Sequence, residues 1–323
     1  MKNFYLNIVF LLTPVCALKG QNEFIVQKLP ATVNTAYDEI TPVIARDGKT
    51  LFFTRAAYPE FNRTLILDTT DYAIKLSPDK YLTMLGGIYR ELGDAAHQKD
   101  PARSPFNQDV WMAEGDSFQQ VSHPGFPLNN ALPNSLVALT PDPNTFYVIN
   151  QFKKTGDMNK GFSYVRKLPD SLGWSFPAPV EIKDFYTITS DVSLTMSFDG
   201  KALILAAARY DSRDMDLYIC FREGENKWSK PLLLEGINSD KREVTPFLSE
   251  DNKTLFFASN RWSSSGGMDI YLAKRLDDTW QNWSAPMRLG EPINSNKDES
   301  QPYFNMTTGC LYFASRREGS SDI

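Results

Sequence analysis

The stretch Ser249-Glu-Asp-Asn-Lys-Thr-Leu-Phe-Phe257 decides the fold, because similar blocks recur along the chain. In this block, Asp251 and Asn252 interrupt two apolar segments. Aspartate caps a tight turn and asparagine accepts a positive φ, so the block predicts a β-hairpin. The apolar triplet that follows, Leu255-Phe-Phe257, is typical of a strand covered on both faces.

Four further copies of the block begin at Ala45, Thr140, Ser197 and Asn305. The offsets between successive copies are 95, 57, 52 and 56 residues. Most copies continue with an Asp-apolar segment and then with Trp-Ser-x-Pro, which predicts four strands per repeat. Four short strands in each unit of this length indicate an all-β fold, a β-propeller of five four-stranded blades, with six possible. A solenoid of strands is the alternative.

The chain is expected to divide into an export signal and one propeller domain. Residues 1–20 carry Lys2 and a short apolar run, which predicts a signal peptide and leaves residues 21–323 as the propeller. Cys16 could carry a lipid, but Thr13-Pro-Val15 before it is a poor lipobox. We therefore expect an exported protein, in the periplasm or associated with the outer membrane, without a transmembrane segment in the mature chain.

The large first offset and the two chain ends carry further predictions. The surplus residues predict an insertion at about 56–106 in the first blade, helical from Pro78. The segment Phe24–Val33 resembles the one that precedes the last copy, so we expect this N-terminal strand to close the last blade. The last copy stops as its third strand begins, which predicts that native sequence continues beyond Ile323.

The repeats resemble the WD40-like β-propeller repeats of the TolB type. The motifs that carry the resemblance are Asp38-Glu39…Pro42…Asp47-Gly48, Glu243…Pro246…Asp251…Ser259-Asn260-Arg261 and Gly266-Gly267-Met-Asp269-Ile270-Tyr271. The resemblance implies a propeller of the Gram-negative envelope, free in the periplasm or fused to an OmpA-like domain. Such propellers mostly mediate protein interactions, and related repeats also precede peptidase domains.

Aligning the copies places one polar residue just before the first strand of each blade: Glu39, Asn134, Asp191, Glu243 and Glu299. First strands line a propeller's channel, so these side chains could form a binding ring at one channel mouth. Carboxylates there could also serve general acid/base chemistry or hold a cation. A residue type that recurs in most blades is more consistent with a structural role in the turns between blades.

An arginine follows the second strand of four copies, and an aspartate opens the third strand of the same copies. The second copy lacks both. Because the arginine and the aspartate are missing together from the second copy, we predict that they form structural ion pairs in the other four copies. The pairs are Arg55 with Asp109, Arg209 with Asp216, Arg261 with Asp269, and Arg316 with Asp322.

The leading functional hypothesis is a non-catalytic interaction scaffold of the cell envelope. It would bind an envelope protein or a peptidoglycan-associated complex, with insertion aromatics at the interface: Tyr58, Phe61, Tyr81 and Tyr89. A net charge of −5 without a basic block argues against a nucleic-acid partner. No metal site, cofactor or catalytic constellation is expected. The alternatives are a glycan-active or glycan-binding propeller that uses channel carboxylates, and a propeller that regulates a downstream peptidase.

Overall fold

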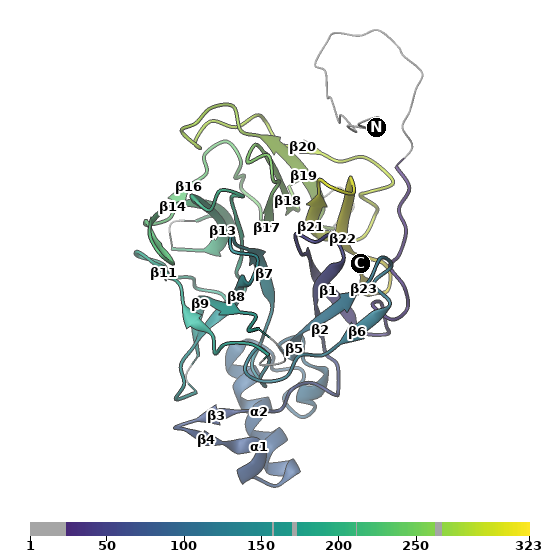
Figure 1. Cartoon of the computed structure of the whole chain (residues 1–323), viewed down its shortest axis with the longest axis vertical. Helices are drawn as coiled ribbons and strands as arrows, with labels where there is room; N and C mark the ends of the chain where they lie inside the picture. The colour runs from purple at the N-terminus through teal and green to yellow at the C-terminus, as the bar shows by residue number, and fades with distance from the viewer. Residues whose placement is uncertain (1–23, 157, 170–172, 211, 262–266) are drawn as a thin grey trace.

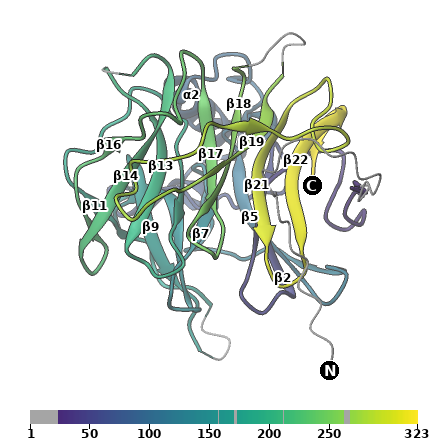
Figure 2. The same cartoon turned by 90° about the horizontal axis from the view of Figure 1, so that it is seen from above.

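The protein is an all-β propeller in which packed sheets surround a central axis. A computed structural model describes residues 24–156, 158–169, 173–210, 212–261 and 267–323. In Figure 1 the sheets follow one another around a ring, from β1 and β2 through β7–β9, β13–β14 and β17–β19 to β21 and β22. Figure 2 shows the same ring from a direction turned by 90°.

The first three sheets contain most of the strands. The first sheet has the order β1 (Asp38–Ile44), β2 (Thr50–Ala56), β5 (Gln108–Glu114), β6 (Gln120–Ser122). The second has β7 (Leu136–Leu139), β8 (Thr145–Phe152), β9 (Met158–Arg166), β10 (Ala178–Pro179). The third has β12 (Ser193–Met196), β13 (Ala202–Ala208), β14 (Met215–Gly224), with β16 (Leu232–Leu233), β15 (Lys227–Trp228) and β11 (Glu181–Ile182) at its outer side.

The remaining two sheets complete the ring. The fourth has β17 (Glu243–Leu248), β18 (Thr254–Ser259), β19 (Asp269–Lys274), β20 (Met287–Arg288). The fifth has β21 (Glu299–Asn305), β22 (Cys310–Glu318), β23 (Ser320–Asp322). Each neighbouring pair of sheets shares a buried apolar cluster, including one between the fifth and first sheets that contains Val33, Phe53 and Ile323.

The prediction of five four-stranded blades needs a correction, because four sheets are complete blades and the fifth has three strands. The N-terminal segment lies beside β23 but makes one backbone hydrogen bond there among the described residues, from Leu29 N–H to Ile323 O at 2.9 Å. The Asn34 side chain brackets Ile323, accepting from its N–H at 2.9 Å and donating to its carbonyl at 2.7 Å. Side-chain bonds replace a regular ladder here, so no fourth strand forms.

The repeated block folds into the predicted hairpin. Gly48 and Gly200 have a φ of 68°, and Asn252 has a φ of 53°, which a turn of this kind requires. Asp251 accepts from the N–H groups of Lys253 and Thr254 at 2.8 Å and from Thr254 Oγ1 at 2.7 Å. The aspartate therefore holds the turn with three hydrogen bonds.

The insertion forms a small helical unit between β2 and β5, at the bottom of Figure 1. It contains β3 (Ile66–Leu67), β4 (Thr70–Asp71), α1 (Tyr72–Lys75), α2 (Pro78–Leu92) and the 3-10 turn η1 (Pro101–Arg103). Gly86 of α2 lies against Gln98, where a Cβ would come 2.0 Å from the carbonyl oxygen, so the helix packs directly on the returning chain. Across the described residues, no helix has the length and apolar character to cross a membrane.

We predict that Asp251→Ala lowers the free energy of unfolding by about 1–2 kcal/mol at neutral pH. Burial opposes the charged form, but the hydrogen bonds from Thr254 and Lys253 outweigh it and lower the pKa of Asp251. Because the pKa of Asp251 is lower in the folded protein, its carboxylate stabilises the folded state at pH values above the unfolded pKa of about 4. This stabilisation is lost as the pH falls through the folded pKa. Urea unfolding from pH 7 to acid should show the two proteins converging, whereas the exposed Asp240→Ala should be neutral throughout.

Candidate functional site

A cavity of about 460 Å³ lies on the propeller axis. All five first strands or the residues just before them contribute to its lining, with Thr41 of β1, Ser135 before β7, Ser193 of β12, Thr245 of β17 and Gln301 of β21. Leu92 and Phe106 of the insertion also line it. The size lies within the range of small-molecule sites, which makes this cavity the candidate functional site.

Hydrogen bonds link successive first strands around the cavity. Thr245 N–H donates to Ser193 Oγ at 3.1 Å, and Gln301 N–H donates to Thr245 Oγ1 at 3.1 Å. Thr41 N–H then donates to Gln301 Oε1 at 2.9 Å. We call these four residues the channel circuit. Each bond occupies an acceptor and leaves the Ser193 and Thr245 hydroxyl hydrogens and the Gln301 amide able to donate.

The channel circuit depends on a bulged and strained backbone. Thr41, Thr245 and Gln301 have φ values of 53°, 48° and 55°, and each lies in a register shift of its strand pair. Positive φ is unfavourable for a β-branched residue and costs on the order of 1–3 kcal/mol. The bulges turn these N–H groups toward the neighbouring blade, and the resulting bonds offset part of the strain.

At the end of the ring formed by the Asp-Gly turns, groups from four blades contact one another. The Arg46 guanidinium lies 4.1 Å from the centre of the Phe198 ring and donates to Thr140 O at 3.0 Å. Phe198 N–H donates to Asn252 Oδ1 at 2.6 Å, which brings a fourth turn into the same contact. Next to this end, Tyr303 O–H donates to Ile44 O at 2.6 Å, and burial raises the pKa of Tyr303.

The opposite end is polar and open. Arg242 Nη2 lies 3.2 Å from Asp191 Oδ2, and both side chains line the cavity although Asp191 is 62% and Arg242 37% exposed. Arg242 Nε is also 3.9 Å from Asp214 Oδ1. Lys160, another lining residue, donates to Ile188 O at 3.3 Å. This mouth therefore offers carboxylate acceptors and guanidinium and ammonium donors to a ligand.

Three members of the predicted binding ring are buried inside the sheets and absent from the cavity lining. Glu39, Glu243 and Glu299 are each 0% exposed. Each accepts from the N–H and hydroxyl groups of a residue four positions earlier, Thr35, Ser239 or Ser295. Arginine nitrogens complete the three sites, at 2.7 Å from Arg55, 2.9 Å from Arg261 and 3.2 Å from Arg317. Burial raises the pKa of Glu39 against these hydrogen bonds.

The two other members of the predicted ring differ from the glutamates. Asn134 is buried, and its Nδ2 donates to the carbonyls of Gln108 and Asn130 at 3.2 and 2.8 Å. Asp191 alone among the five lines the cavity. The ring predicted at the channel mouth is thus not formed, because burial takes the glutamates into inter-strand contacts.

The predicted Arg–Asp pairs are also wrong in three blades. Register places Arg55 between Glu39 and Asp109 on its two neighbouring strands, and the ion pair forms with Glu39. Arg261 likewise contacts Glu243. In the fifth sheet Arg316 contacts Asp38 at 2.8 Å instead of Asp322. In the third sheet, Arg209 lies over the Tyr186 ring at 4.0 Å, and burial raises the pKa of Asp216.

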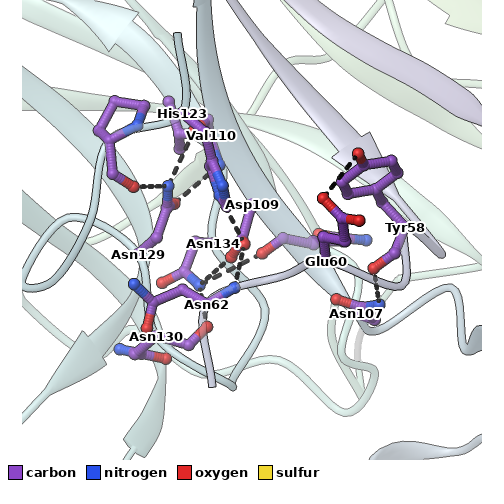
Figure 3. A network of polar contacts seen from close by, with 12 residues as sticks. Tyr58, Glu60, Asn62, Asn107, Asp109, Val110, His123, Asn129, Asn130 and Asn134 are labelled. Carbon is purple, nitrogen blue, oxygen red and sulfur yellow. Dashed lines mark hydrogen bonds and ion pairs between the residues drawn. The ribbon is translucent and has the colours of Figure 1, made fainter. Parts of the chain in front are cut away.

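The third-strand aspartates pair with basic residues of the outer segment instead. Asp269 binds Arg288 through two bonds of 2.7 and 2.8 Å, and Asp322 lies 2.8 Å from Lys28. In the first sheet the basic residue is His123, whose Nε2 is 2.8 Å from Asp109 Oδ2 (Figure 3). The N–H of Asn62, in the insertion, donates to the same oxygen at 2.6 Å, and burial raises the pKa of Asp109.

The insertion aromatics lie mainly in its core and do not form the predicted exposed interface. Phe61, Tyr81 and Tyr89 are buried in one apolar cluster with Leu85. Tyr89 O–H donates to Ala131 O at 2.6 Å, and burial raises the pKa of this tyrosine. These residues attach the insertion to the ring. Tyr58 is half-buried, with its ring 5.4 Å from that of Trp111.

Sequence reasoning missed the mouth residues Lys160 and Arg242 and an exposed aromatic pair beside them, Tyr186 and Tyr210. No repeat signal marks them, because the other copies carry different residues at these positions. Exposed tyrosines near an aspartate of the ring position are the one signal that could have drawn attention to them. Among the described residues, no three His, Cys, Asp or Glu side chains gather where they could hold a metal ion.

The chain is similar in fold to several solved structures. No protein-family model and no curated protein matches the sequence. Similar solved structures include TolB from Acinetobacter baumannii, with a TM-score of 0.40 and 14% identity over 67% of this chain and 45% of that one. A putative TolB from Agrobacterium tumefaciens has a TM-score of 0.44 and 14% identity over 87% of this chain and 71% of that one.

An endo-arabinase from Bacteroides thetaiotaomicron VPI-5482 is also similar, with a TM-score of 0.48 and 11% identity over 91% of this chain and 94% of that one. The similarity to the two TolB structures is one of overall fold. The prediction that the chain is not an enzyme is corrected, because a propeller fold is compatible with enzyme activity and one fold hosts many functions. Function has to be argued from this chain's own residues.

We predict that Glu243→Gln lowers the free energy of unfolding by about 3 kcal/mol, because it breaks a largely buried ion pair and leaves Arg261 without its carboxylate. Asp191→Asn is the matched control, since its carboxylate is mostly exposed, and should change stability by less than about 0.5 kcal/mol. Urea unfolding of both variants checks this. Equal effects would contradict the structural assignment of Glu243.

Proposed function

We propose that this propeller binds a saccharide in the axial cavity, through its open mouth. The observation that carries the proposal is the axial cavity with a mouth edged by the Asp191–Arg242 ion pair. A saccharide presents adjacent hydroxyl groups that both donate and accept. The carboxylate of Asp191 can accept from two such hydroxyls while the guanidinium of Arg242 donates.

The lining supports a polyhydroxylated ligand over an apolar one. The channel circuit leaves hydroxyl and amide donors of Ser193, Thr245 and Gln301 toward ligand oxygens. Glycoside hydrolysis commonly uses a pair of carboxylates. The described lining contains the carboxylate of Asp191 alone, so binding is the part of the proposal that these residues support most directly.

The location and partner belong to the same proposal. Export and envelope location rest on residues 1–20, which lie outside the described residues. The sugar strand of peptidoglycan is one ligand of the proposed chemistry, and it connects this site with the expected peptidoglycan-associated complex. A scaffold function would instead use the outer faces of the ring, and the insertion aromatics no longer supply an exposed interface for it.

We also propose that the ring counts five blades, with residues 24–34 serving as the outer segment of the fifth. Asn294 brackets Ile270 in the fourth sheet as Asn34 brackets Ile323, accepting at 2.7 Å and donating at 2.9 Å. Asn34→Ala should lower the free energy of unfolding by about 2 kcal/mol, as should Asn294→Ala. Hydrogen exchange of the Ile323 amide checks the closure, and unchanged protection in Asn34→Ala would contradict it.

The binding proposal is tested by isothermal titration calorimetry of the full chain. The probes are disaccharides and hexasaccharides from xylan, mannan, arabinan and chitin. Arg242→Met should weaken binding of the recognised series about 10- to 100-fold, since a hydrogen bond to a charged group contributes about 1.5–3 kcal/mol. Asp191→Asn should weaken binding in the same direction.

Arg166→Met is the control, because Arg166 is exposed on the outer part of β9 and pairs with Glu225 at 3.3 Å. Its affinity should equal that of the unchanged protein. Product analysis of the same samples would detect shortened sugars if the site is catalytic. If no saccharide in the panel binds, or if Arg242→Met binds as tightly as Arg166→Met, the proposal is wrong.

A further inference from the structure

Two tyrosines lie on the surface close to the cavity mouth. Tyr210 is 84% and Tyr186 36% exposed, and their ring centres are 5.7 Å apart with 31° between the planes. Ile188, next but one to Tyr186, is also exposed. Other aromatic pairs such as Phe52–Phe146 are buried between sheets, so packing of the core does not explain this one.

The position of the pair is fixed by contacts of the backbone and of Arg209. Ile188 N–H donates to Ala208 O at 2.9 Å, which holds the segment before β12 against the end of β13. Tyr210 stands two residues after the end of β13. The Arg209 guanidinium lies 4.0 Å from the centre of the Tyr186 ring and donates to Asp184 O at 3.2 Å. These contacts hold Ile188 and the Tyr186 ring against the end of β13.

The pair is continuous with the cavity along one short segment. Ser190 and Asp191, which follow Ile188 in the chain, line the cavity. Lys160, another lining residue, donates to the carbonyl of Ile188. A ligand that extends out of the mouth past Asp191 on this side meets Tyr186 and Tyr210.

We infer that Tyr186 and Tyr210 form a platform for further sugar rings of an oligosaccharide whose end occupies the cavity, an inference that rests on the proposed function. One face of a pyranose ring carries C–H groups and is apolar, and it stacks on an aromatic ring. Tyrosine combines such a face with a polar hydroxyl, and it loses little conformational freedom on binding. The ligand class is thus an oligosaccharide longer than the cavity alone can hold.

The charges near the pair favour this occupant over a protein anchor. Arg209 lies against the Tyr186 ring, and Lys160 and Asp191 lie along the segment that joins the pair to the cavity, so charged donors and acceptors suited to hydroxyl groups border this surface. A protein interface core is instead depleted in charged residues. The exposed apolar area is also confined to three side chains, which matches a few sugar rings.

The test compares a hexasaccharide with a disaccharide of the series that binds in calorimetry. In the unchanged protein the hexasaccharide should bind more tightly. Tyr210→Ala should weaken hexasaccharide binding by about 2- to 12-fold, and the double variant with Tyr186→Ala should weaken it further, because each aromatic contact contributes at the scale of an aromatic pair. Disaccharide affinity should remain unchanged in both variants, and Tyr210→Phe should retain the hexasaccharide affinity.

Leu276→Ala is the matched control, an exposed apolar side chain just after β19. Tyr210 is so exposed that its removal should leave the unfolding midpoint unchanged, which separates lost binding from lost folding. Equal affinity for both sugar lengths in the unchanged protein, with loss of both in Arg242→Met, would overturn the platform and leave the cavity proposal standing. Unchanged hexasaccharide binding in the double variant would overturn it too, and failure of every saccharide to bind would overturn both proposals.

Discussion

A buried glutamate at the start of a first strand is the interaction on which the mouth of this propeller depends. Glu39, Glu243 and Glu299 each bring a negative charge out of water, which costs several kcal/mol unless the charge is fully partnered. Each receives hydrogen bonds from the turn that enters its blade and an arginine nitrogen from the end of the second strand or just after it. These contacts join the turn, the start of the first strand and the end of the second strand, so the mouth is formed before any ligand binds.

The second and third blades lack this buried glutamate, and their residues Lys160 and Asp191 form the cavity mouth together with Arg242 of the fourth blade. The equivalent position is neutral Asn134 in the second blade and exposed Asp191 in the third. Asp191 does not have the structural role of the buried glutamates. It lines the cavity and pairs with Arg242 from the next blade. The tyrosine platform precedes and follows β12 and β13 of the same third blade. The third blade therefore contains both a departure from the repeat, at Asp191, and the residues that we propose for ligand binding.

The sequence predicts most of the fold because the copies share what the fold needs. The Asp-Gly and Asp-Asn turns, the apolar second strands and the insertion before β5 all follow from comparing repeats. Pairing of charges does not follow, because a strand residue such as Arg55 has a neighbour on each side, and the choice of Glu39 over Asp109 depends on burial that three dimensions decide. The insertion tyrosines look like interface residues for a similar reason: sequence shows their type but not the small core that they build.

The candidate site was the least predictable part of the structure. A comparison of repeats detects the residues that the copies share, whereas a ligand site on a pseudosymmetric ring consists of residues that the copies do not share. The other copies carry different residues at the positions of Lys160, Tyr186, Tyr210 and Arg242. The strained residues of the channel circuit show the intermediate case. Thr41, Thr245 and Gln301 share a bulge before proline, yet the hydrogen-bond acceptor that each finds belongs to another blade. Because the bonds cross between blades, the wall of the cavity is rigid only when the ring is assembled, and the ligand meets a surface that no single repeat encodes.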